Sequence, residues 1–189
     1  GKVAPEMTVG DLKGGANHII ISGSDPRGSN YIHYEWPAGG TGASDGTDGS
    51  NAVRSYNEGD FNSIQSVEMV EAQFPLRIER CEIRESACGD GEFRGGFGLR
   101  RDVKILGRTG ALSVLSEKNV IPPYGVEGGS NGAANSFTVI RDGEITQPSP
   151  VPGKVSGFPL KTGDVVREET AGGGGYGDPL KRDPELVRT

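Results

Sequence analysis

Apolar and polar residues alternate along much of this chain, which is the pattern of β-strands that bury one face. The alternation predicts strands at residues 17–21, 31–36, 76–84, 102–106, 111–115, 137–141 and 165–169. Within residues 76–84 the apolar side chains change face between Ile78 and Cys81. This strand should therefore contain a bulge or lie at a sheet edge.

Short turn motifs separate the predicted strands. Asp25-Pro26-Arg27-Gly28 and Lys161-Thr162-Gly163-Asp164 have the composition of turns. Arg141-Asp142-Gly143-Glu144 is a strong hairpin signal, because Asp-Gly tolerates the positive φ of tight hairpins. Helices are expected only at residues 64–74 and in a C-terminal turn capped by Asp183, with Pro184 at its first position.

Glycine is unusually abundant, at 32 of 189 residues, and proline adds 12 more, yet hydrophobic residues still reach 33%. The glycines follow no collagen-like period, so many tight turns between short strands account for them best. We therefore expect a single mainly β domain over residues 1–189. It should be a compact barrel or sandwich of short strands with long glycine-rich loops and one or two short helices.

The formal net charge is −6 and the basic residues are scattered, which disfavours nucleic acid and membrane as partners. No apolar run approaches the ~18 residues of a membrane span and no signal-peptide pattern opens the chain, so we expect a cytoplasmic protein. Cys81 and Cys88 lie far from the two histidines. Reduced structural thiols are the better interpretation, and no metal site is expected.

Four consecutive glycines, Gly172–Gly175, lead into the sequence Tyr-Gly-Asp-Pro. We interpret the run as an ordered turn where backbone passes very close to a ligand, a subunit or another loop. Gly174, Tyr176 and Asp178 are therefore candidates for lining a substrate site or an interface.

A second glycine-rich segment covers residues 39–49. The amides of Gly39, Gly40 and Gly42 could form a concavity for an anion, whereas Asp48 would favour a cation or hydrogen-bond donors. The spacing lacks the closing glutamate of a calcium loop, and a turn with Asx hydrogen bonds is an equal alternative.

Arg94 lies between two glycine-rich stretches and could hold a phosphate or carboxylate through paired hydrogen bonds. The charged strand before it fits a solvated face or an interface better than a catalytic site. His18 and His33 lie within predicted strands, where a packed, hydrogen-bonded histidine is the commoner outcome; His18 is kept as a candidate lining residue. No nucleophile elbow is present, and the catalytic base is unassigned.

Nucleotide-binding motifs are incomplete. Gly172, Gly174 and Gly177 match a dinucleotide fingerprint, but the helix and acidic residue that must follow it are not found before Thr189. A P-loop motif is also missing from the sequence. We expect the chain alone to bind no ATP.

Taken in order, the segments described above resemble the C-terminal third of the hydantoinase B/oxoprolinase family. The matching stretches run from Gly14 to Val187: GGANHIIISGSDPRG, YEWPAGGTGASDGTDGSNAV, FPLRIERCEIRESACGDGEFRGGFGLRRDVKI, PPYGVEGGSNG, DGE, KTGDVVREETAGGGGYGDP and RDPELV. One such glycine loop would be a weak signal, whereas seven in register are a strong one.

The resemblance implies a protein that works with a hydantoinase A-like subunit, with the remainder of a hydantoinase B-like subunit and with a small-molecule substrate. The A-like partner would carry ATP and magnesium on an actin-like fold, and ATP would activate a carbonyl or enolate oxygen by phosphorylation. No cofactor is expected on this chain. The family's metal ligands belong to an N-terminal portion outside these residues.

Residues 54–68 distinguish two activities within the family. Cyclic-amide hydrolases usually have a histidine and a T-N-x-x-N-x-P-V-E segment here, whereas this chain has Arg54 and then Asn57-Glu58-Gly59-Asp60, which is more similar to acetone and acetophenone carboxylases. The resemblance thus favours a multisubunit ATP-dependent ketone carboxylase. The alternatives are an ATP-dependent cyclic-amide hydrolase of the hydantoinase or oxoprolinase type, and a structural assembly domain without active-site residues.

Overall fold

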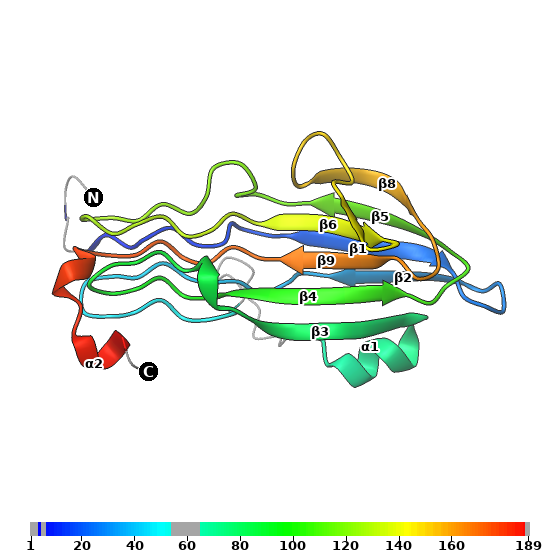
Figure 1. Cartoon of the computed structure of the whole chain (residues 1–189), viewed down its shortest axis with the longest axis horizontal. Helices are drawn as coiled ribbons and strands as arrows, with labels where there is room; N and C mark the ends of the chain where they lie inside the picture. Colours follow the sequence, from blue (N-terminus) through cyan, green and yellow to red (C-terminus); the bar gives the residue numbers. More distant parts are fainter. Residues whose placement is uncertain (1–3, 5–6, 54–64, 188–189) are drawn as a thin grey trace.

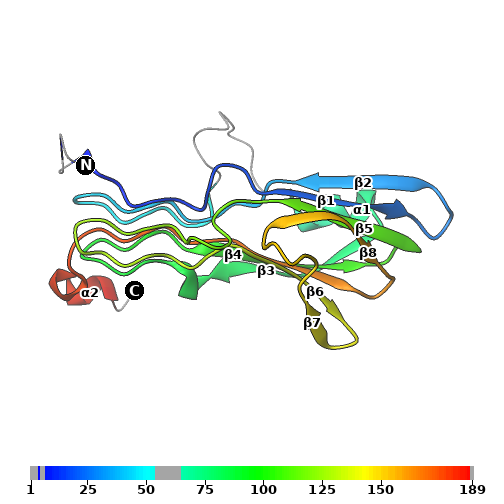
Figure 2. The same ribbon diagram turned by 90° about the horizontal axis from the view of Figure 1, so that it is seen from above.

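The computed structural model describes residue 4 and residues 7–53 and 65–187. Within these residues the strands form two antiparallel sheets packed face to face, a sandwich and not a closed barrel (Figure 2). The first sheet has the order β2-β1-β5-β8: Asn30–Glu35, His18–Ser24, Thr109–Leu115 and Lys154–Leu160. The second has the order β3-β4-β9-β6-β7: Leu76–Arg84, Gly98–Ile105, Val165–Glu169, Ser136–Arg141 and Glu144–Thr146.

The hydrophobic core lies between the sheets. Ile21 and Leu112 project from the first sheet and Val103 and Val166 from the second, and all four are fully buried. Each such side chain stabilises the fold by about 1.5–3 kcal/mol through burial. The helix α1, Val67–Gln73, lies beside β3 and adds Val70 to this core (Figure 1).

Most local expectations are confirmed. β3 and β9 have the predicted bounds, and β3 has its bulge between Ile78 and Arg80. The Asp-Gly hairpin joins β6 to β7, with φ of 53° at Asp142 and 84° at Gly143. The C-terminal helix α2 (Pro184–Val187) begins at Pro184, as expected, and follows the short helix η4, Pro179–Lys181. The helix expected from residue 64 is α1; Ile64 itself lies outside the described residues.

The strand β8 was not predicted. Its sequence contains Gly157, with φ of 62°, and Pro159, both unusual inside a strand. They are tolerated because β8 is the edge of its sheet and its register with β5 shifts between Leu112 and Val114.

The glycine-rich segments form a second region, a bundle of extended chains that prolongs the sandwich at one end (Figure 1). A central segment, residues 171–177, is surrounded by six others: residues 9–13, 38–43, 93–98, 87–91, 129–133 and 123–126. Backbone hydrogen bonds of 2.7–2.9 Å join each surrounding segment to the next around the ring: Gly10 N to Ala43 O, Gly96 N to Thr41 O, Gly95 N to Gly89 O, Ser130 N to Asp90 O, Gly132 N to Pro123 O and Asp11 N to Tyr124 O.

The central segment has a three-residue period. The amides of Gly173, Gly174 and Gly175 donate to three different neighbours, Gly96 O, Asp11 O and Ser130 O, at 2.8–3.0 Å. A Cβ placed on Gly172 or on Gly175 would overlap a carbonyl of the same segment, residues 87–91. Three residues per turn is the geometry of a polyproline II helix, which makes no internal hydrogen bonds and must find its partners in neighbouring chains.

The four-glycine run is therefore ordered, as expected, but it is not a turn. None of Gly172–Gly175 has φ in the left-handed region. Glycine is required here because neighbouring carbonyl oxygens occupy the places that Cβ atoms would take. The turn comes later, at Gly177, whose φ is 74°.

Candidate functional site

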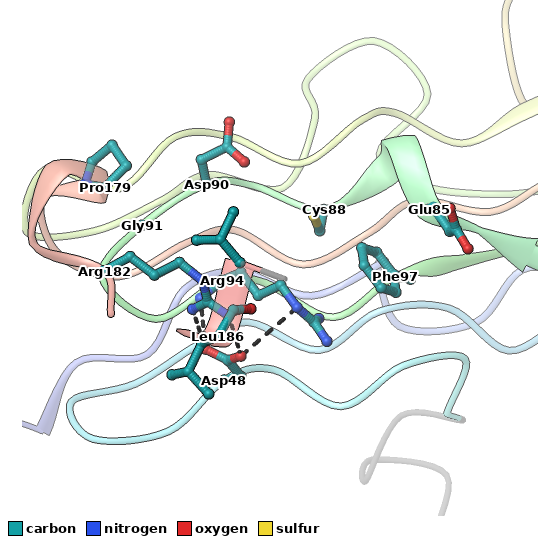
Figure 3. Close-up of a pocket in the computed structure, with 11 residues that line it drawn as sticks. Asp48, Glu85, Cys88, Asp90, Gly91, Arg94, Phe97, Pro179, Arg182 and Leu186 are labelled. Carbon is teal, nitrogen blue, oxygen red and sulfur yellow. Dashed lines mark hydrogen bonds and ion pairs between the residues drawn. The ribbon is translucent and has the colours of Figure 1, made fainter. Parts of the chain in front are cut away.

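A pocket of about 530 Å³ opens on the flank of the bundle, beside the C-terminal helices (Figure 3). Residues of the bundle line one part of the pocket, and residues of the C-terminal segment line another. Its lining residues are Asp48, Glu85, Cys88, Asp90, Gly91, Arg94, Phe97, Pro179, Arg182, Leu186 and Val187.

Asp48 is the electrostatic centre of this pocket. Its two carboxylate oxygens accept parallel hydrogen bonds of 2.8 Å from the two terminal nitrogens of Arg182, and the backbone amide of Arg94 donates to it at 2.9 Å. The hydrogen bond from Arg182 is the main cause that lowers the pKa of Asp48 below its usual range. Asp48 is thus a fixed anion at neutral pH and is unsuited to act as a general acid.

Arg94 is held rigidly at the pocket surface. Its Nη1 donates to Asn51 Oδ1 and to Gly95 O, both at 3.1 Å, and its guanidinium lies 4.2 Å from the centre of the Phe97 ring. The Nε of Arg94 is 3.7 Å from Asp48, a looser contact than that of Arg182. A guanidinium fixed by stacking and by hydrogen bonds on one side can offer its remaining donors to a carboxylate or phosphate.

The thiol of Cys88 lines the same pocket but is not activated. Burial raises its pKa, so the thiol stays protonated at neutral pH and is a poor nucleophile. Cys81 and Cys88 are both free. Across residues 7–53 and 65–187, no group of three or more histidine, cysteine or acidic side chains is arranged to hold a metal. The pocket therefore has no activated nucleophile, and with three acidic side chains against two arginines it has no excess of positive charge. Arg94 is the side chain in it that is suited to bind an anionic group, because Arg182 is paired with Asp48.

The structure brings together two of the predicted site residues, Asp48 and Arg94, across an interval of 46 residues. The partner that the sequence did not reveal is Arg182, which lies 134 residues from Asp48. It falls in the short C-terminal turn, where a lone arginine carries no local signal. Only the Asp-Pro steps around it indicate a structured end.

The other predicted residues have packing or capping contacts. Gly39, Gly40, Gly42 and Gly174 lie inside the bundle, where each Cβ position is occupied by a neighbouring chain. These glycines line neither the pocket around Asp48 nor a pocket beside β6 and the segment 147–153.

Tyr176 and Asp178 lie at the far end of the central segment. Tyr176 packs on Phe93, with ring centres 6.3 Å apart. Asp178 caps η4 by accepting from Leu180 N at 3.0 Å. His18 lies on β1 between Tyr34, whose hydroxyl is 2.5 Å from His18 Nδ1, and Trp36, whose indole donates to the same nitrogen at 2.9 Å.

His33 is packed, as expected, with its ring 5.0 Å from that of Phe74, but the expected hydrogen bond is not found in the part of the chain that the structure describes. Neither ring nitrogen has a hydrogen-bond partner among the described residues, although Nε2 is 3.4 Å from Glu35. His33 and Glu35 form, with Arg101 and Glu168, a buried charge cluster between the sheets that the sequence did not reveal.

Comparison with known proteins decides the family. A sequence model of the hydantoinase B/oxoprolinase family matches residues 1–179. The chain belongs to this family. It is 31% identical to the B-type subunit of the putative D-/L-hydantoinase of a Pseudomonas species, over 92% of this chain and 29% of that protein.

Two solved structures share the fold. The ATP-dependent caprolactamase of Pseudomonas jessenii superposes with a TM-score of 0.75 and 26% identity, over 99% of this chain and 33% of the other. A nucleotide-free acetone carboxylase superposes with a TM-score of 0.71 and 19% identity, over 90% of this chain and 27% of the other. The second likeness shows the fold alone.

The chain spans about three tenths of the length of the hydantoinase relative and 11–13% of the length of the relatives named 5-oxoprolinase. Among the described residues, no helix is both long and apolar enough to cross a membrane.

Proposed function

We propose that this chain is part of the B-type subunit of an ATP-dependent enzyme that opens a cyclic amide. The supporting observation is its 31% identity to the B-type protein of a putative hydantoinase, over nearly the whole chain. Relatives named as the beta chain of a caprolactamase and as 5-oxoprolinase add two more proteins named for cyclic amides.

The proposed division of labour places ATP and magnesium on an A-type subunit. Transfer of the γ-phosphoryl group to the amide oxygen would give a phosphorylated imidate. One water would add to the ring carbon, and the ring C–N bond would then break, leaving an amine and an acyl phosphate. A second water would hydrolyse the acyl phosphate to a carboxylate and inorganic phosphate. The new carboxylate is the kind of anion that Arg94 is suited to hold. The glycine bundle would keep this arginine in place, because its segment, residues 93–98, is bonded to segments on either side.

A ketone carboxylase is the second candidate. The observation in its favour is the sequence Asn57-Glu58-Gly59-Asp60, which lies outside the described residues. In that reaction, ATP would activate the ketone as an enol phosphate, and bicarbonate would supply the carboxyl group.

One assay separates the two activities. The complete B-type protein, purified with its A-type subunit, would be given Mg-ATP with a hydantoin, 5-oxoproline or caprolactam, and separately with acetone or acetophenone plus labelled bicarbonate. Phosphate release that depends on a cyclic amide, without incorporation of label, is expected. Label in a product that depends on a ketone would overturn the hydrolase and support the carboxylase.

A variant tests the role of Arg94. Arg94→Gln should raise KM for the cyclic amide at least about tenfold, the cost of one charge-assisted hydrogen bond of about 1.5–3 kcal/mol. Arg80→Gln is the matched control, since Arg80 is half exposed on β3 and, among the described residues, pairs with Glu82. Equal kinetics for both variants would remove Arg94 from the site and leave the reaction type standing.

A further inference from the structure

The buried charge cluster, His33, Glu35, Arg101 and Glu168, lies between the two sheets. Each of the four residues is at most 3% exposed. His33 and Glu35 come from β2, Arg101 from β4 and Glu168 from β9. These three strands join directly to the bundle: β2 leads into residues 38–43, β4 follows residues 93–98, and β9 leads into the central segment. The cluster thus lies where the sandwich meets the bundle.

Within the cluster, the guanidinium of Arg101 is already engaged. Its Nη1 pairs with Glu35 Oε1, and its Nη2 donates to Gln65 O at 3.3 Å. His33 Nε2 approaches the second oxygen of Glu35 at 3.4 Å. Glu35 therefore balances the one permanent positive charge of the cluster.

Glu168 is left without such a partner. It is 1% exposed, and no donor among the described residues lies within hydrogen-bonding distance of either carboxylate oxygen. In the strand register it stands opposite Arg101 on β4 and opposite Phe137, an apolar residue, on β6. The nearby acid of β4, Asp102, is bound by Arg100 and Arg167, so neither of these arginines is left for Glu168.

A buried carboxylate with no hydrogen-bond donor is strongly disfavoured as an anion, and a second anion close by disfavours it further. Burial and the negative charge of Glu35 both raise the pKa of Glu168 well above its usual range, and Arg101 opposes them only in part. The neutral acid, in contrast, needs only one weak acceptor and leaves the Arg101–Glu35 pair balanced.

We propose that Glu168 is a buried proton-binding site, occupied at neutral pH, at the junction between the sandwich and the glycine bundle. Loss of this proton would make Glu168 a second anion beside Glu35. The new charge would lie on β9, the strand that continues into the central segment. Because the folded state holds the proton more tightly than the unfolded chain does, the stabilising contribution is complete below the unfolded pKa of Glu168. It is lost progressively as pH rises towards the folded pKa.

Infrared spectroscopy of the complete protein tests the proposal directly. At pH 7 the spectrum of the parent minus that of Glu168→Gln should show the carbonyl stretch of one protonated carboxylic acid. Glu169→Gln is the matched control: Glu169 is the next residue, partly exposed and 3.9 Å from Arg84, and its removal should leave that band in place. A difference spectrum with carboxylate bands in place of the acid band would overturn the proposal.

A second measurement does not depend on the variant folding. In the parent labelled with carbon-13 at glutamate carboxyl carbons, one resonance should keep the chemical shift of the neutral acid at pH 7. If every glutamate resonance has the shift of the ionised form at that pH, Glu168 is an anion and the proposal is wrong.

Discussion

The sandwich is stabilised mainly by contacts between side chains, whereas the glycine bundle is stabilised mainly by hydrogen bonds between backbone groups. In the sandwich, side chains such as Ile21, Leu112 and Val166 fill the space between two sheets. In the bundle, the central segment has almost no side chains, and backbone amides and carbonyls of neighbouring segments bind one another directly. A buried amide left unpaired costs about 1–3 kcal/mol, so the bundle tolerates little separation of its segments.

This difference changes what a substitution does. A core side chain in the sandwich can be shortened, and the cost depends on how well the cavity collapses. A glycine in the bundle can only be enlarged, and the added carbon meets a carbonyl oxygen that is itself held by hydrogen bonds. The bundle should therefore be the less tolerant region.

The largest effect is expected at Gly174. A Cβ added there would overlap Tyr124 O and contact the backbone amide of Gly125. Gly174→Ala should destabilise the complete protein by more than about 4 kcal/mol or prevent folding, because the clash cannot be relieved by rotating a side chain. Thermal or denaturant unfolding, with the yield of soluble protein, measures this.

The control is Gly15→Ala. A Cβ on Gly15 would lie 3.5 Å from one oxygen of Glu117, an ordinary contact, and its φ is outside the left-handed region. Its cost should stay within about 1 kcal/mol. Similar stability of the two variants would mean that the bundle can expand, contrary to our account.

A smaller effect, dependent on pH, is expected at Asp48. Because Arg182 lowers its pKa in the folded state, Asp48 contributes stability that is present above its unfolded pKa and is lost as pH falls through the folded value. Asp48→Asn should cost about 1–3 kcal/mol at pH 7. The difference from the parent should shrink in acid, as followed by denaturant unfolding from pH 7 to pH 2.

Asp45→Asn provides the reference for that comparison, since Asp45 is exposed in the same loop. It should stay within about 0.5 kcal/mol of the parent across the range. A pH-independent difference at Asp48 would show that the contact with Arg182 contributes nothing through its charge.

The sandwich could be predicted from the sequence because alternation encodes a buried face directly. β3 and β9 were predicted with their observed bounds, whereas β8 was missed because Gly157 and Pro159 interrupt its pattern. The bundle could not be predicted in the same way. Its three-residue period is visible only in the backbone contacts of the folded chain. A run of glycines has no pattern of apolar and polar side chains from which that period could be predicted. The available signal was the recurrence of paired glycines at 39–40, 95–96, 128–129 and 172–175.

Part of the lining of the pocket could be predicted from the sequence for a related reason. Asp48 and Arg94 stand out because they interrupt glycine-rich stretches. Arg101 and Glu168 lie within runs of charged residues, where a solvated face is the usual interpretation, and only the pairing of β4 with β9 shows that both point into the core.

Hydrogen exchange of the central segment tests the main claim most directly. The amides of Gly173, Gly174 and Gly175 donate to three different neighbouring segments, so they can exchange only when the bundle opens. In the complete protein, measured by NMR or by mass spectrometry of the peptide that contains them, they should exchange as slowly as the amides of β1 in the sandwich. Exchange at the rate of an exposed loop would contradict the account.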